Sequence, residues 1–243
     1  MGRGKRRSAP KLSPVARVRI PAVKRTLASA CLIALLALPA GAQANVLELG
    51  AGAPPAKVSC PNSCQAIGQV TGYQGRAGAR SSPFVVPRPG KIVAFTVTLG
   101  RPDPRQQRFF DNLYSGPPQV RLSILRRGKR RSNRLNHRLM DQSRAFRVDR
   151  YLGSSPTFAL GRPLVVRRGY IVALTVPTWA PAFAVGLPRS NWWRSSRRKN
   201  DCKNVSQMAA QQTLRSVKVY GCTYFTARVL YSATFVPDPQ PTS

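Results

Sequence analysis

Residues that could perform acid–base chemistry are scarce in this chain. Its 243 residues include seven acidic side chains and one histidine, His137, against 40 Lys and Arg, so the formal charge is +33 at pH 7. A glycosidase needs two carboxylates in one groove, and Asp111, Asp141 and Asp149 are placed to supply them, but their spacing favours no pair. A nucleophile elbow, a phosphate-binding glycine loop and a multi-histidine motif are all missing. We therefore expect no catalytic residue and no cofactor, and we keep a carbohydrate-active enzyme built on Asp141 or Asp149 as the alternative.

Basic side chains gather in two clusters. The first is a loop that contains Arg126, Arg127, Lys129, Arg130 and Arg131. The second follows Trp192 and Trp193 and contains Arg194, Arg197, Arg198, Lys199 and Lys203. Aromatic rings beside arginines can stack on bases or on sugar rings.

Our candidate ligand-binding residues are the aromatic side chains Trp179, Trp192 and Trp193 and the basic side chains of the first cluster, Arg126, Arg127, Lys129, Arg130 and Arg131. Trp179 follows a predicted strand, where it would either form a carbohydrate platform at the rim or cover the end of the core. For the charged loops the alternative is plain solvation, because 31 of the 40 basic residues are Arg and a GC-rich coding sequence produces that bias. Without a nucleic-acid-binding motif, the charge alone predicts only non-specific attraction to anionic polymers.

The N-terminal 44 residues have the three regions of a secretory signal peptide. Nine basic residues precede an apolar run from Leu27 to Leu38, and Ala42-Gln43-Ala44 then offers a cleavage site after Ala44. The alternative is a membrane anchor formed by an uncleaved segment 27–44, but the apolar run is shorter than the ~20 residues that cross a bilayer. We expect a secreted mature chain, 45–243, with no transmembrane span and 31 basic against seven acidic residues.

Four cysteines remain in the mature chain, namely Cys60, Cys64, Cys202 and Cys222. An even number in an exported protein favours disulfides. Three pairings are possible: Cys202 with Cys222 is the local one, and the others tie the N-terminal segment to the last third of the chain. Four thiolates around zinc are the alternative, but the Cys-x3-Cys spacing differs from that of zinc ribbons, so we expect no metal.

Alternating apolar residues predict strands. Residues 92–99 place Val93, Phe95, Val97 and Leu99 on one face, and residues 120–125 alternate in the same way. Residues 224–235 predict one long half-buried strand, with Phe225, Ala227, Val229, Tyr231, Ala233 and Phe235 on the buried face. Between the first two strands, Pro104 to Leu113 has helical spacing, with Phe109, Phe110 and Leu113 able to turn inward.

An internal resemblance suggests how the strands are arranged. Residues 83–97 resemble residues 163–176, and each reads as a strand, a glycine-containing turn and a second strand. We expect an all-β protein, an antiparallel β-sandwich of jelly-roll kind with one short helix. We divide the chain into the signal peptide 1–44, a linker 45–57, one domain 58–236 and a disordered tail 237–243.

The chain resembles uncharacterised exported β-sandwich proteins of actinobacterial type. The resemblance rests on Pro83-Phe84-Val85-Val86, on Gly116-Pro117-Pro118 leading into Arg121-Leu122-Ser123-Ile124-Leu125, and on the segment 172–181. It covers most of 58–236 and implies the fold but no activity.

The sequence thus favours a secreted, disulfide-stabilised, non-catalytic module that binds or supports an extracellular polymer or the cell envelope. A carbohydrate-active enzyme and a non-specific polyanion binder are the alternatives.

Overall fold

The computed structural model describes residues 46–53 and 55–240. The predicted signal peptide, residues 1–44, therefore lies outside the described residues. Within the predicted linker, Leu47–Leu49 form a short strand paired with the last strand of the chain, and Leu49 is buried. Part of that segment thus belongs to a sheet, although three residues are too few for an alternation to be recognised.

The described chain is mostly β, with antiparallel curled sheets. Its elements are β1 (Leu47–Leu49), β2 (Ile67–Ala77), β3 (Arg80–Ser81), β4 (Gly90–Val97), α1 (Pro104–Leu113), β5 (Gln119–Arg127), β6 (Asn136–Gln142), β7 (Phe146–Arg147), β8 (Thr157–Val166), β9 (Ile171–Ala180), β10 (Phe183–Ala184), β11 (Trp192–Ser195), β12 (Val217–Val219), β13 (Cys222–Phe225), β14 (Arg228–Val229) and β15 (Tyr231–Pro237). Short 3-10 turns lie at Arg131–Asn133, Asp149–Tyr151 and Lys199–Asp201.

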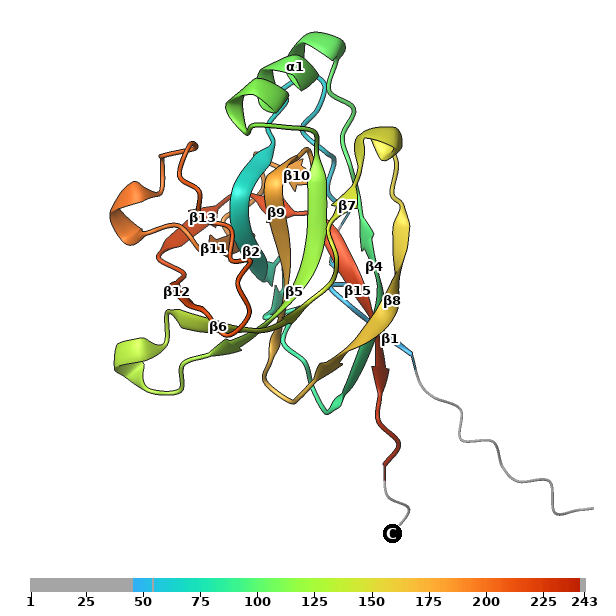
Figure 1. The fold of residues 1–243 in the computed structure, drawn as a ribbon, viewed down its shortest axis with the longest axis vertical. Coiled ribbons are helices and arrows are strands. Elements are labelled where there is room, and N and C mark those ends of the chain that lie inside the picture. The colour runs from blue at the N-terminus through green and yellow to red at the C-terminus, as the bar shows by residue number, and fades with distance from the viewer. Residues whose placement is uncertain (1–45, 54, 241–243) are drawn as a thin grey trace, which may run out of the picture. The chain divides into compact units, whose positions relative to one another are not determined.

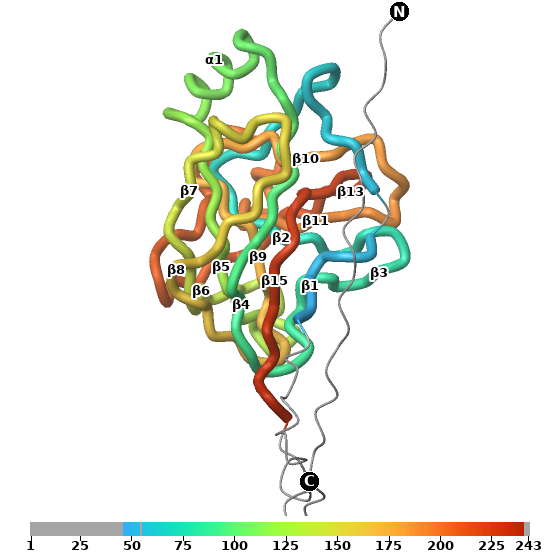
Figure 2. Tube along the Cα trace, turned by 90° about the vertical axis from the view of Figure 1, so that its right-hand side faces the viewer, coloured from blue at the N-terminus to red at the C-terminus, as the bar shows by residue number. Residues whose placement is uncertain are grey.

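Two large sheets organise these strands (Figure 1). Sheet A has the order β1-β15-β4-β8, and sheet B has the order β12-β6-β5-β9-β2-β11-β13, with β3 attached to β2 and β7 to β5. A small ribbon pairs β10 with β14. In Figure 2, β15 and β4 lie side by side, as their residue-by-residue pairing requires.

One apolar core joins the two sheets. Sheet A contributes residues such as Phe95 and Phe235, and sheet B contributes residues such as Leu122 and Leu174, all of them fully or almost fully buried in a single cluster. Burial of a large aliphatic or aromatic side chain contributes about 1.5–3 kcal/mol. The core therefore holds the two sheets against each other.

A bulge changes the predicted buried face of β4. Phe95 and Val97 are buried as expected, but Val93 is only half-buried and Ile92 is fully buried instead. Against β15, the register shifts so that Thr234 faces Ala94 and Phe235 faces Ile92, which leaves Val93 as an extra residue. An extra residue reverses the in–out alternation beyond it, so the prediction for Val93 was wrong.

The two similar segments, 83–97 and 163–176, do not form two separate hairpins. Gly90, Lys91 and Ile92 pair with Val166, Val165 and Leu164, while Val85 bridges to Ile171. The strands of one segment therefore pair with strands of the other segment. The sequence pattern predicted the strands and the turns but not which strands pair.

The predicted C-terminal strand is three strands. β13, β14 and β15 pair with β11, β10 and β4 respectively, and Thr226 between the first two has a φ of 59°. The alternation holds from Ala227 to Phe235, but Phe225 is exposed because the left-handed residue turns the chain after it.

Helix α1 begins with a capping box. The Asp103 carboxylate accepts from the Gln106 backbone N–H at 2.8 Å, the Gln106 side chain accepts from the Asp103 N–H at 2.9 Å, and Pro104 starts the helix. Phe110 turns inward as predicted, whereas Phe109 is 59% exposed, because adjacent helical residues point about 100° apart.

The cysteines form the local pairing, Cys60–Cys64 and Cys202–Cys222. The second bond closes a loop that lies over sheet B, where the Ala209 N–H donates to the Gln69 carbonyl and the Gln211 N–H donates to the Thr71 hydroxyl. We call residues 202–222 the disulfide loop.

We expect the double substitution Cys202→Ser and Cys222→Ser to lower the free energy of unfolding by about 3 kcal/mol, because the bond closes a loop of about twenty residues. Urea unfolding of the purified protein measures the loss. The pair Cys60→Ser and Cys64→Ser, which opens a much smaller loop, is the control and loses about 2 kcal/mol. A larger loss in the control than in the first pair would contradict the assignment.

Candidate functional site

Trp192 and Trp193 are placed by two glycines of β2. A side-chain carbon on Gly75 would lie 1.8 Å from the Trp192 ring, and one on Gly72 would lie 2.7 Å from the Trp193 ring. The tryptophans are neighbours on β11, so they face opposite sides of sheet B. They therefore cannot form one continuous platform.

Trp179 covers one end of the core. Its side chain is fully buried, its ring packs 5.0 Å from that of Phe110 on α1, and its indole N–H donates to Asp111 Oδ1 at 2.8 Å and to the Gly116 carbonyl at 3.1 Å. Of the two roles considered for Trp179, this geometry matches the buried cover and leaves no exposed ring face.

Trp193 lines a cleft of about 320 Å³, which we call the aromatic cleft. Its walls come from β2 and the two residues before it, the residue after α1, β10, β11 and the chain just after it, β13 and the disulfide loop. The lining residues are Gln65, Ala66, Ile67, Gly68, Val70, Tyr114, Phe183, Trp193, Arg197, Cys202, Lys203, Val205 and Tyr224. The Trp193 and Tyr224 rings stack at 4.6 Å, and Phe183 meets Trp193 edge-on at 5.7 Å. The volume lies at the lower end of the range for small-molecule sites.

Arg197 is the charged group inside this cleft. It is only 7% exposed, and it donates to the Gly68 carbonyl at 3.2 Å, the Val205 carbonyl at 3.4 Å and the Tyr224 hydroxyl at 3.4 Å. The Gly68 carbonyl lies where the register between β2 and β9 shifts. The cleft therefore contains a cation held by neutral acceptors.

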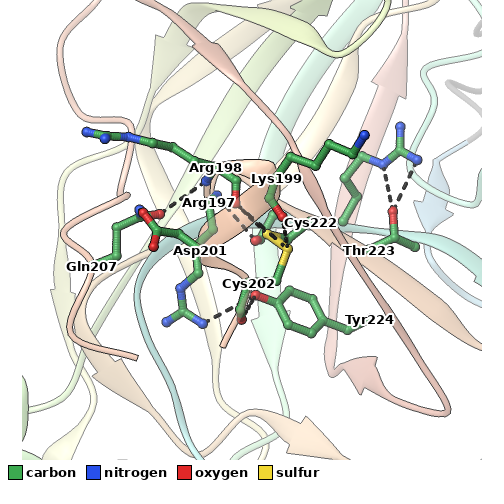
Figure 3. Close-up of a disulfide and its surroundings, with 11 residues drawn as sticks. Arg197, Arg198, Lys199, Asp201, Cys202, Gln207, Cys222, Thr223 and Tyr224 are labelled. Atoms are coloured by element: carbon green, nitrogen blue, oxygen red, sulfur yellow. Dashed lines mark hydrogen bonds between the residues drawn. A yellow bond between two sulfur atoms is a disulfide. The ribbon is translucent and has the colours of Figure 1, made fainter. Parts of the chain in front are cut away.

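Both disulfides hold walls of the cleft. Cys60–Cys64 precedes Gln65 and Ala66, and Cys202 itself lines the cleft. In Figure 3, Tyr224 points its hydroxyl toward the Cys202 carbonyl, to which it donates at 2.7 Å, beside the Cys202–Cys222 bond. The covalent bonds and this hydrogen bond fix the position of the disulfide loop against β13.

The basic loop and Trp192 meet on a different face of sheet B. A shallow hollow of about 50 Å³ is lined in part by Tyr73, Arg127, Trp192 and Arg194. The Arg194 guanidinium lies 5.7 Å from the Trp192 ring centre. Of the predicted basic residues, this hollow includes Arg127. Arg126 at the end of β5, and Lys129, Arg130 and Arg131 between β5 and β6, are exposed and do not line it.

Most carboxylates have structural partners. Asp141 accepts two bonds from Arg162, at 2.7 and 2.9 Å, and these bonds hold its pKa below the usual value even though burial acts in the opposite direction. Asp149 pairs with Arg147 at 3.2 Å. Asp103 caps α1, Asp111 accepts from Trp179, and Asp201 accepts from Gln207. A lowered pKa at Asp141 is the opposite of what a general acid needs.

Arg162, the partner of Asp141, lines a groove of about 550 Å³ between β8 and the segment from the end of β6 to β7. Arg162 lies in an irregular part of β8. Ile92 and Ala94 of β4 pair with Leu164 and Ala159 of β8, so β8 has three more residues than β4 between these two pairs. Arg144 covers the Phe146 ring at 4.7 Å in the same groove. None of the residues that line this groove is acidic, and Asp141 is connected to it through its ion pair with Arg162.

His137 belongs to β6 and is fully buried. A carbonyl can only accept, so the contact of 2.8 Å to the Leu135 carbonyl identifies Nδ1 as the protonated nitrogen, and Nε2 then accepts from the Tyr73 hydroxyl at 3.1 Å. Burial lowers the pKa of His137 to about 4 and raises that of Tyr73. Leu135 is two residues from His137 in the chain, whereas Tyr73 comes from β2, so only the tertiary structure brings the second orienting partner to the ring.

Groups of three or more metal-binding side chains are missing from the described residues. All four cysteine sulfurs of the zinc alternative are used in the two disulfides.

No protein-family model, curated protein or solved structure matches this chain. Assignment of a function therefore depends on the geometry of the chain itself.

We expect the free energy of unfolding to fall as the pH drops from about 6.5 to about 4. The His137 pKa is lower in the folded state, so the unfolded chain binds the proton more readily; the stabilisation is fully present above pH 6.5 and decreases by about 3 kcal/mol down to pH 4. Urea unfolding at a series of pH values measures this slope. His137→Gln, which cannot titrate, should flatten it, and an unchanged slope in that variant would refute the assignment.

Proposed function

We propose that this chain is an exported, non-catalytic β-sandwich of jelly-roll kind that acts outside the cell as an extracellular or envelope-associated binding or structural module. The observation that carries the binding role is the aromatic cleft, which combines stacked rings, a buried guanidinium and a size suited to one small ligand group.

The strand pairings support the jelly roll. Taking the main strands in chain order as β1, β2, β4, β5, β6, β8, β9 and β15, the first pairs with the last, the second with the seventh, the third with the sixth and the fourth with the fifth. That is a long antiparallel hairpin rolled up into two four-stranded sheets, the arrangement of a jelly roll. The shared core between sheets A and B supports their packing as a sandwich.

The bonds of the carboxylates support a non-catalytic role. Asp141 and Asp149, on either of which the enzyme alternative would depend, each form an ion pair with an arginine, and the Asp141 pKa is lowered. A glycosidase acid needs a raised pKa.

Two features support export. The signal-peptide pattern precedes residue 45, and disulfides persist in oxidising compartments. A helix long and apolar enough to cross a bilayer does not occur within 46–53 and 55–240.

A second candidate function is association with anionic polymers. It is favoured by the meeting of Arg127, Arg194 and Trp192 at one hollow, and by the excess of 31 basic over seven acidic residues in the mature chain. Such binding is expected to weaken steeply with salt because it depends on counterion release.

We expect the purified protein to be retained by an immobilised wall polysaccharide at physiological salt, and Val205→Trp to abolish that retention. Val205 is 46% exposed and lines the cleft, so a larger ring fills the mouth without disturbing the core. Retention on a panel of wall polysaccharides, polyphosphate and DNA, at low and physiological salt, is the measurement.

The matched control is Leu214→Trp, a similarly exposed position in the same disulfide loop that does not line the cleft. Equal retention of both variants would exclude the cleft. Retention on every polyanion that disappears with salt, and that falls in Arg127→Ser with Arg194→Ser, would assign the charge-based function instead.

We expect the exported protein to begin at Asn45, because the small residues Ala42 and Ala44 suit cleavage after Ala44. Intact mass measurement of the protein from the culture medium tests this. A chain that keeps residues 27–44 and stays with the membrane would support the uncleaved anchor.

A further inference from the structure

The aromatic cleft holds a cation without a counter-charge. All seven acidic residues lie in the described part of the chain, and the ion pairs there join Arg147 to Asp149 and Arg162 to Asp141, not Arg197 to any carboxylate. None of the residues that line the cleft is acidic, whereas Arg197 lies in its wall and Lys203 is exposed at its edge. A buried charge is costly unless it is paired.

The hydrogen bonds of Arg197 are also incomplete. A guanidinium has five N–H donors, and three contacts of 3.2 to 3.4 Å lead to neutral oxygens of Gly68, Val205 and Tyr224. The Nε of Arg197 is buried and has no hydrogen-bond partner. The two contacts at 3.4 Å are at the weak end of the range, so a carboxylate could replace these acceptors with shorter, charge-assisted bonds.

A second donor in the same cleft lacks a partner. The indole N–H of Trp193 is buried without an acceptor, although tryptophan N–H groups usually find one. The two residues that carry these unpartnered donors, Trp193 on β11 and Arg197 just after that strand, both line the aromatic cleft. This is the arrangement expected of a site whose acceptor comes from a ligand.

One part of the cleft wall is apolar. Ile67, Val70 and Phe183 form that part and supply no side-chain donors, whereas Gln65, Tyr114 and Lys203 add polar groups elsewhere in the lining. A single carboxylate matches the single buried guanidinium of Arg197. The volume of about 320 Å³ suits one ring-sized body.

We propose that the aromatic cleft binds a compact carboxylic acid, with the carboxylate on Arg197 and the ring-sized body against Ile67, Val70 and Phe183. The inference rests on the proposed binding function and names the chemistry of its ligand. The shared chemistry is a carboxylate on a six-membered ring or one carbon away from it, which either a uronic acid unit of a polysaccharide or a free aromatic acid supplies.

Calorimetric titration of the purified protein with matched pairs tests the proposal. The probes are glucuronate against glucose, and phenylacetate against phenylacetamide. We expect the acid of at least one pair to bind at least about tenfold more tightly than its neutral partner, as a charge-assisted bond predicts. Preference for glucuronate identifies a sugar source, and preference for phenylacetate identifies a free aromatic acid.

Arg197→Met removes the guanidinium while keeping an unbranched apolar stem, and we expect it to weaken acid binding about 10- to 100-fold and leave the neutral probe unchanged. Arg198→Met, an exposed neighbour outside the cleft, is the matched control and should bind like the unaltered protein. If Arg197→Met does not fold, Lys203→Met and the matched probes on the unaltered protein still decide the outcome.

The outcomes separate the two proposals. If acid and neutral probes bind equally and Val205→Trp abolishes that binding, the proposed preference for a carboxylic acid is refuted, but the cleft remains a binding site. If none of the four probes binds, the proposed carboxylic acid ligand is refuted. Retention on a neutral polysaccharide that Val205→Trp abolishes would still support the proposed extracellular binding function. Acid binding unchanged in both Arg197→Met and Lys203→Met overturns the assignment of the carboxylate to this cleft.

Discussion

Strand β9 must be buried on both faces, and much of the molecule follows from that constraint. All six residues from Ile171 to Val176 are buried. Val172, Leu174 and Val176 point into the core shared with sheet A, while Ile171, Ala173 and Thr175 face the opposite side of sheet B. Sheet A covers the first face, so a second layer has to cover the other.

The disulfide loop supplies that second layer, and polar groups beneath it are paired. The hydroxyls of Thr71 and Ser123 each lie 2.7 Å from that of Thr175. Gln211 donates to the His137 carbonyl and accepts from the Tyr220 hydroxyl. Such a network stabilises only when its members are satisfied, which explains why a loop with little regular structure is closed by a covalent bond.

The aromatic cleft forms where this covering layer ends. Arg197 leaves β11 at the edge of the loop, and its contacts with the Gly68 and Val205 carbonyls join sheet B to the loop. The same guanidinium thus organises the loop and presents charge to a small apolar hollow. The basic face around Arg127 and Arg194 lies apart from that hollow, so a charge-driven association with polymers and a selective small site can exist on one chain without sharing residues.

The sequence alone determined the local features: the capped helix at Pro104–Leu113, most inward positions of its strands, and the local disulfides as one of three pairings. These depend on side-chain periodicity and short-range bonds, which are written in neighbouring residues. Bulges escaped it, because a single extra residue at Val93 is defined only against a partner strand. The sequence indicated only part of the cleft. Trp193 and Arg197 lie in or beside the second basic cluster, but Tyr114, Phe183 and Tyr224 join them from elements far apart in the chain. Only tertiary packing decided which tryptophans are buried and that Arg197 is buried without a carboxylate partner. Burial and ion pairing are properties of residues that are brought together across long sequence distances.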